Sequence, residues 1–169
     1  MNITEPTRMK SLIFKRVIEE LSQLIGFKEP ESLVKGDKLR IGECRVTFIH
    51  DPKANPNDMF VYVDMGPLDV ERKDAYLTLL KINFELDSGT RGVFSMHPET
   101  NHLFYSFRCE LNEHATGRHL LGSLVRFIGG AAFEGLCLPK EENKVSHPVA
   151  SGSRSNAARL IAAAEHGRY

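Results

Sequence analysis

The 169-residue sequence is long enough for one domain of ordinary size plus a tail; 41% of its residues are hydrophobic and 26% are charged. Lysine plus arginine and aspartate plus glutamate each total 22, so the formal net charge is zero. This balance argues against a protein that binds nucleic acid or a membrane surface through a basic excess. No apolar run approaches the roughly 18 residues of a membrane-spanning helix, so we expect no membrane insertion.

The first ten residues are polar and lack the apolar centre of a secretory signal, so residues 1–10 are predicted to be a flexible N-terminus. Three scattered cysteines, Cys44, Cys109 and Cys137, suit a reducing compartment better than a disulfide framework. We therefore expect a cytoplasmic protein whose cysteines are core or half-buried side chains.

The first predicted element is a helix that starts at Ser11 and is capped by Gly26. Its apolar residues recur at intervals of three and four, which is the spacing of one helix face. They are Ile13, Phe14, Val17, Ile18, Leu21, Leu24 and Ile25. Residues 28–38 contain Pro30 and Gly36 and are predicted to be a loop.

Strands are predicted at 39–41, 44–49 and 59–65. The inward-facing phase changes parity at Gly42-Glu43, and such a change requires a bulge or a turn there. The segment 59–65 is apolar on both faces, which indicates a central strand or a binding surface.

A second helix is predicted over 76–86, with two separate apolar stripes. A helix that covers one sheet needs only one such stripe, so the second indicates contact with another body, such as a second copy of the chain. One stripe holds Leu77, Leu80 and Phe84, and the other holds Leu79, Ile82 and Leu86.

The segment 92–107 has β-forming residues on both sides of His97-Pro98-Glu99-Thr100-Asn101, which predicts a hairpin. Asn112 or Thr116 is positioned to cap a third helix that runs to about Phe133. After Pro139 large apolar residues become few, and 140–169 is predicted to be a flexible polar tail with a short helix at 157–165.

These elements predict an α+β domain over 11–139, with a mostly antiparallel twisted sheet covered by three helices on one side, in the order α-β-β-(β)-α-β-β-α.

Catalytic and metal-binding motifs are lacking, and no cofactor is expected. His97 and His102, and again His114 and His119, are five residues apart, and a metal site can be drawn from them with Glu110 and Glu113. Exposed histidines at a turn and a helix start are the commoner situation. A Cys109–His114 nucleophile pair is likewise less common than a cysteine packed in the core.

The most distinctive stretch is LLKINFELDSGTRGVFSMHPETNHLFYSFR. It resembles the type III secretion chaperones of the Tir-chaperone family, whose pattern is leu-leu-x-x-asn-phe, a small glycine loop, a strand, x-pro-glu-thr and a second strand. The first helix, which ends in Leu24-Ile25-Gly26-Phe27, resembles the family's helix ending in leu-gly-leu. The matching positions are Leu79, Leu80, Asn83, Phe84, Gly89, Gly92, Pro98, Glu99 and Thr100.

The resemblance implies a cytoplasmic homodimer without enzymatic activity. Such a protein binds the N-terminal segment of one or more secreted effectors, keeps it extended, and hands it to the export ATPase. Family dimers often use the second helix, which points to Leu79, Ile82 and Leu86 as the dimer contact and leaves the Leu77 stripe to the fold. Family grooves involve the first helix and neighbouring strands, and the effector-binding candidates are Phe14, Ile18, Ile25, Phe48, Phe60 and Tyr62.

Two features differ from the family, whose members are commonly acidic and shorter. This chain has a pI of about 7.1 and the additional tail. Two alternatives remain open from the sequence: a small Cys/His or metal-assisted hydrolase, and a protein-binding regulatory module that acts outside secretion.

Overall fold

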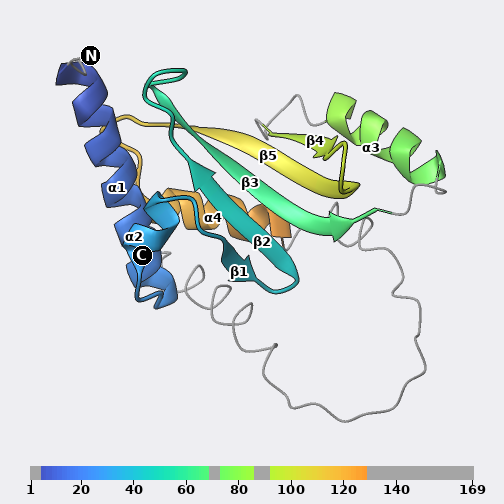
Figure 1. Cartoon of the computed structure of the whole chain (residues 1–169), viewed down its shortest axis with the longest axis horizontal. Helices are drawn as coiled ribbons and strands as arrows, with labels where there is room; N and C mark the ends of the chain where they lie inside the picture. The colour runs from blue at the N-terminus through green and yellow to red at the C-terminus, as the bar shows by residue number, and fades with distance from the viewer. Residues whose placement is uncertain (1–4, 69–72, 86–91, 129–169) are drawn as a thin grey trace, which may run out of the picture.

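The computed structural model describes residues 5–68, 73–85 and 92–128 (Figure 1). The described chain is α+β, with a five-stranded antiparallel sheet and four helices rather than the three predicted. The elements are α1 (Glu5–Ile25), α2 (Pro30–Val34), β1 (Leu39–Ile41), β2 (Cys44–Ile49), β3 (Asp58–Pro67), α3 (Lys73–Glu85), β4 (Gly92–Met96), β5 (His102–Glu110) and α4 (Gly117–Ile128).

Two of the differences from the predicted elements lie within residues 5–38. Helix α1 starts at Glu5 rather than Ser11, because an acidic residue and Pro6 in the first turn favour a helix start even where no apolar stripe exists. The predicted loop 28–38 contains α2, which has a proline in its first turn and buries Leu33 completely. The predictions for residues beyond 128, including the tail, lie outside the described residues.

The turn signals in the first half of the chain are confirmed. Gly26 follows α1 with a φ of 72°, and the N–H of Phe27 donates to the carbonyl of Ser22 at 2.8 Å, which closes the helix end. Gly42 has a φ of 60° and lies in the turn between β1 and β2, which pair in the register Ile41↔Cys44. The parity change in the sequence is therefore a tight hairpin.

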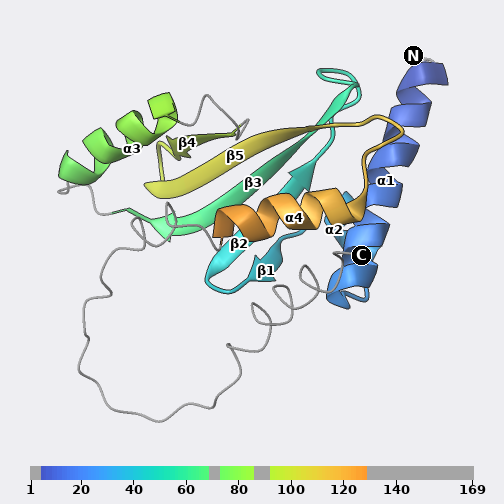
Figure 2. The same ribbon diagram turned by 180° about the vertical axis from the view of Figure 1, so that it is seen from behind.

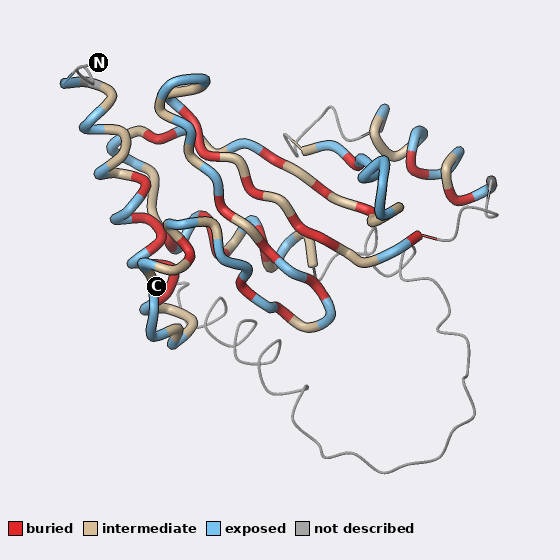
Figure 3. Tube along the Cα trace, in the orientation of Figure 1, coloured by how far each residue is buried: buried red, intermediate tan, exposed pale blue. Residues whose placement is uncertain are grey.

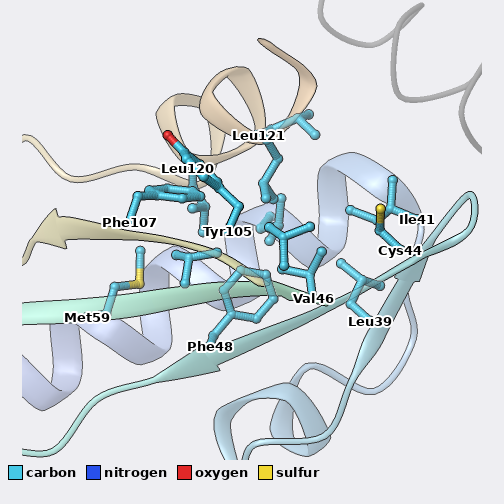
Figure 4. Close-up of a cluster of buried hydrophobic side chains, with 14 of the residues drawn as sticks. Leu39, Ile41, Cys44, Val46, Phe48, Met59, Tyr105, Phe107, Leu120 and Leu121 are labelled. Atoms are coloured by element: carbon cyan, nitrogen blue, oxygen red, sulfur yellow. The ribbon is translucent and has the colours of Figure 1, made fainter. Parts of the chain in front are cut away.

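The sheet has the order β1-β2-β3-β5-β4, so β3 is the central strand (Figure 1). Helix α4 crosses one side of the sheet only, and it comes to the front when the molecule is turned by 180° (Figure 2). Buried and less buried residues alternate along the strands (Figure 3), as expected for a sheet with one covered face. The covered face supplies most of the core, including Val46, Phe48, Met59, Val61, Val63, Tyr105 and Phe107 (Figure 4).

Helices α1 and α4 approach so closely that Gly117 is needed at the contact. A Cβ on Gly117 would lie 2.3 Å from the backbone nitrogen of Leu21. The carboxylate of Glu20 accepts a hydrogen bond from the Gly117 N–H at 2.8 Å and so caps the start of α4. The loop before α4 is held by the same helix, because Arg16 donates to the Ala115 carbonyl at 2.9 Å and Lys10 donates to that of Leu111.

Helix α3 lies along the outer edge of β4 (Figure 1). The amide of Asn83 pairs with both backbone groups of Phe94: its oxygen accepts from the N–H at 2.7 Å, and its nitrogen donates to the carbonyl at 3.0 Å. This pairing satisfies the β4 edge at the position where another strand would otherwise bind.

The orientation of α3 buries the stripe that the sequence predicted to contact a second copy, and it exposes the stripe that the sequence predicted to pack on the fold. Leu79 is only 7% exposed and Ile82 packs against the core, whereas Leu77, Leu80 and Phe84 are 61%, 65% and 86% exposed. The Leu77 stripe is therefore not the face used by the fold. Leu86 lies outside the described residues.

We predict that Gly117→Ala destabilises the protein by about 1–3 kcal/mol, because the new methyl group must push α1 and α4 apart. Gly122→Ala is the matched control on the same helix, since no atom lies within 4 Å of its added Cβ. That control should stabilise the protein by up to about 1 kcal/mol through helix propensity. Urea unfolding measures the change in the free energy of unfolding that each variant causes. Equal changes in the two variants would contradict the close contact between α1 and α4 at Gly117.

Candidate functional site: the open face of the sheet

No described helix covers the sheet face opposite α4 (Figures 1 and 2). Strand register places a group of apolar residues on this face. Phe60 and Tyr62 lie two residues apart on β3 with ring centroids 6.4 Å apart in a stacked arrangement. Both rings are half-buried. Together with their neighbours on this face they form what we call the aromatic strip: Ile49, Phe60, Tyr62, Val93 and Phe104.

Strand register explains how the aromatic strip forms. Phe60 lies opposite Ile49 of β2, and Tyr62 lies opposite Ser106 of β5, which in turn is opposite Val93 of β4. Residues on one face of neighbouring strands are in side-chain contact range, so alternation along four strands brings these positions together. Ile49 and Val93 are 44% and 47% exposed, which is high for large aliphatic residues on a sheet.

Two ion pairs lie on this open face. Arg45 approaches Asp64 at 3.5 Å and Arg108 approaches Asp58 at 3.6 Å. The carboxylate side chains are only 5% and 12% exposed, whereas the arginine side chains are 50% and 54% exposed. The solvent-facing charge of each pair is therefore the guanidinium.

Asp64 is a buried junction between β3 and β5. Its carboxylate oxygen Oδ1 accepts a hydrogen bond from the Gly66 N–H at 3.0 Å, and the same oxygen lies 2.8 Å from Nδ1 of His102. Burial alone would raise the pKa of Asp64, but the Gly66 N–H, the imidazole of His102 and the guanidinium of Arg45 outweigh it and hold this pKa below its ordinary value. The junction fixes the end of β3 at a register irregularity between Asp64 and Pro67.

The predicted effector-binding residues fall into two groups. Phe60 and Tyr62 lie on the aromatic strip, as described above. Phe14, Ile18 and Phe48 are 4%, 0% and 1% exposed and belong to the core of the single chain. Helical and strand periodicity identified them correctly as inward-facing, but their burial is supplied by the chain itself, so they leave no surface for a partner. Ile25 is half-buried and packs at the margin of the core.

The exposed stripe of α3 was missed as a candidate surface. The signal that could have identified it is Asn83, which lies on the Leu79 side of the helix. Asn83 is half-buried, and polar groups removed from water are generally hydrogen-bonded; its amide pairs with the backbone of Phe94 in β4. The Leu77, Leu80 and Phe84 stripe must then face outward.

The four candidate histidines each have a local partner. His97 Nδ1 accepts from the Glu99 N–H in the β4–β5 turn, and His102 contacts Asp64. His119 Nδ1 lies 3.3 Å from the carbonyl oxygen of His114. Among residues 5–68, 73–85 and 92–128, no group of three or more His, Cys, Asp or Glu side chains is placed to hold a metal ion.

Cys109 and His114 do line one cavity of about 290 Å³ beside the start of α4, together with His119 and Glu110. A thiol is activated by an imidazole whose nitrogen lies within hydrogen-bond reach of the sulfur. The Nε2 atom of His114 instead lies 3.5 Å from Oε1 of Glu113, and both of these side chains are more than four-fifths exposed. The geometry of His114 is that of a surface ion pair.

A second polar constellation joins α1 to the end of β2. Nε2 of His50 lies 3.3 Å from the Ser11 hydroxyl, and Nδ1 lies 3.1 Å from the backbone carbonyl of Asp58. The hydroxyl also donates to the Thr7 carbonyl at 3.2 Å. Backbone N–H groups inside a helix are used by its own ladder, so they do not form the oxyanion site that acyl transfer requires. We interpret this constellation as a tether.

No protein-family model matches the chain, and no curated protein matches it. Within the described ranges, none of the helices has both the length and the apolar character required to cross a bilayer.

We predict that Asp64→Asn destabilises the protein by about 1–3 kcal/mol at neutral pH, because charge-assisted hydrogen bonds are lost. A carboxyl with a lowered folded-state pKa contributes stability above its ordinary pKa of 3.8, and this contribution disappears as pH falls through the folded-state value.

Urea unfolding should therefore show that the free energies of unfolding of the wild type and Asp64→Asn differ strongly at about pH 5.5 and only slightly at about pH 2.5. Asp37→Asn, at an exposed position, serves as the control and should have little effect at either pH. A difference that does not change with pH would contradict the role assigned to the Asp64 carboxylate.

Proposed function

We propose that this protein is a type III secretion chaperone that binds the N-terminal segment of one or more secreted effector proteins and keeps it extended and competent for export. A protein that binds only the unfolded form of such a segment holds it away from folded or aggregated states by mass action. The proposal includes a cytoplasmic location, absence of enzymatic activity, and transfer of the cargo to the export ATPase.

The observation that carries the proposal is that one small chain has two separate apolar surfaces without a partner in the described residues. One is the aromatic strip, and the other is the exposed stripe of α3. Contiguous exposed apolar surface of this kind commonly marks a site of protein interaction. The resemblance of the segment from Leu79 to Arg108 to the secretion chaperones gives these two surfaces an interpretation: one for the effector and one for a second copy.

We assign the dimer contact to Leu77, Leu80 and Phe84. The edge of β4 is engaged by Asn83, so a second copy has no free backbone groups at Phe94 with which to extend the sheet. Packing of one α3 against its symmetry mate would bury the stripe that the single chain leaves in solvent, and a two-fold axis makes such a contact self-complementary.

We assign the effector contact to the aromatic strip, with Phe60 and Tyr62 at its centre. Two aromatic side chains on neighbouring positions of one strand provide apolar area together with a hydroxyl that can pair with a polar group of the partner.

Leu80→Lys should convert a dimer to a monomer, because it places a charge at the centre of the proposed contact. Thr78→Lys is the matched control on the same helix; Thr78 is exposed but lies on the side of α3 away from the stripe. Sedimentation of both variants at micromolar concentration measures the outcome. A monomeric wild type, or equal dissociation of both variants, would refute the assignment of the dimer contact.

Phe60→Ser with Tyr62→Ser should weaken capture of an effector's N-terminal segment by at least about tenfold, since two aromatic contacts are lost. The test is co-expression with the N-terminal segments of secreted proteins encoded in the same genome, followed by measurement of the complex mass. Thr78→Lys again serves as a control that should retain capture. If the wild-type protein captures none of these segments, the proposed function fails.

A further inference from the structure

We propose that the aromatic strip receives an amphipathic helix of the partner protein, with one carboxylate at each end of that helix's apolar face. This inference rests on the proposed function only in taking the open face as a site for a partner segment. It assigns a helix to the part of the otherwise extended, unfolded segment that lies on the strip, and it adds the sign and spacing of the charges on that helix.

The charges follow from the unequal burial within the two ion pairs. The carboxylates of Asp64 and Asp58 are turned into the protein, while the guanidinium groups of Arg45 and Arg108 extend into solvent on opposite sides of the strip, at two ends of a diagonal that crosses it at Tyr62. Each guanidinium has five N–H donors in a fixed fork, and a single carboxylate at about 3.5 Å leaves several of them available. A partner carboxylate can therefore be added without displacing the internal one.

The spacing follows from strand register. Arg45 lies opposite Asp64 on the β2 side of β3, and Arg108 lies opposite Phe60 on the β5 side. Four residues along a strand span about 13 Å, and two strand spacings add about 10 Å at right angles, so the two arginine backbones are about 16 Å apart on a diagonal. Tyr62 lies midway between them, and Phe60 lies beside Arg108.

A diagonal of about 16 Å matches about eleven residues of an α-helix at 1.5 Å each. Residues eleven apart lie on nearly the same helix face, since eleven residues make about three full turns. Two carboxylates at this spacing can thus reach both arginines while the apolar side chains between them contact the strip.

A helix fits this face better than the other two occupants. An extended peptide gains most of its affinity from backbone pairing at a sheet edge, which the middle of a sheet face cannot provide. A membrane surface favours a large basic excess, whereas the open face also carries Asp58, Asp64 and Glu110. A helix on the open face would complete the second layer that the described residues do not supply on this side.

The test uses two labelled synthetic peptides of about five helical turns with the same apolar face. One peptide carries Glu at two positions about eleven residues apart, and the other carries Lys there. Fluorescence anisotropy with the full chain should give about tenfold tighter binding of the Glu peptide at low salt, and the two affinities should converge as salt is raised.

Arg45→Gln with Arg108→Gln should remove this preference while circular dichroism confirms that the variant folds. Arg118→Gln with Arg126→Gln, at two exposed positions on α4, is the matched control and should retain it. Loss of the preference in the first variant alone supports the proposal.

Three results would overturn it. If both peptides bind wild type equally and Phe60→Ser weakens both, the face is a docking surface, and the proposed function stands without the acidic preference. If neither peptide binds while effector capture succeeds, the cargo is not a helix of this type. If phosphatidylserine vesicles bind in an Arg45- and Arg108-dependent manner and the peptides do not, the face is a lipid site.

Discussion

The close contact between α1 and α4 at Gly117 determines how the rest of the chain is arranged. Because a Cβ at this position would meet the backbone of Leu21, the two helices can approach only if the residue is glycine. Glu20 then caps α4, and Lys10 and Arg16 hold the loop that leads to it from β5. One helix thus fixes the start, the direction and the preceding loop of the other, and both pack against the core on one side of the sheet.

Placing α1 and α4 on one face has a consequence for the opposite face. An antiparallel sheet with a single covered face normally presents polar residues to solvent on the other. Here the central strand presents Phe60 and Tyr62 instead, with Ile49 beside them. The side of the sheet that no described helix covers is therefore more apolar than solvent exposure alone would favour, although two ion pairs with exposed arginines also lie on it.

Local sequence patterns predicted the element types well and the identity of contacting surfaces less well. The periodicity of Val17, Ile18 and Leu21 predicts a helix face, and the structure contains it. The parity change at Gly42 predicts a bulge or a turn, and the structure has the turn. Periodicity reports that a residue is inward-facing, but not whether its own chain or a partner covers it. Phe14 and Phe48, which the resemblance assigns to a groove, are covered by their own chain. The two stripes of α3 could not be ranked by hydrophobicity, because the amide pairing of Asn83 with β4 decides between them.

The two apolar surfaces lie on different elements, and this separation bears on how they could be used together. The exposed stripe of α3 lies beyond β4 at one edge of the sheet, whereas the aromatic strip is centred on β3 (Figure 1). A contact between two α3 helices would therefore leave both aromatic strips open. Two strips related by a two-fold axis would offer a partner chain two sites on one assembly. A segment long enough to reach both would gain affinity from the second contact through effective concentration, even if each strip alone binds weakly.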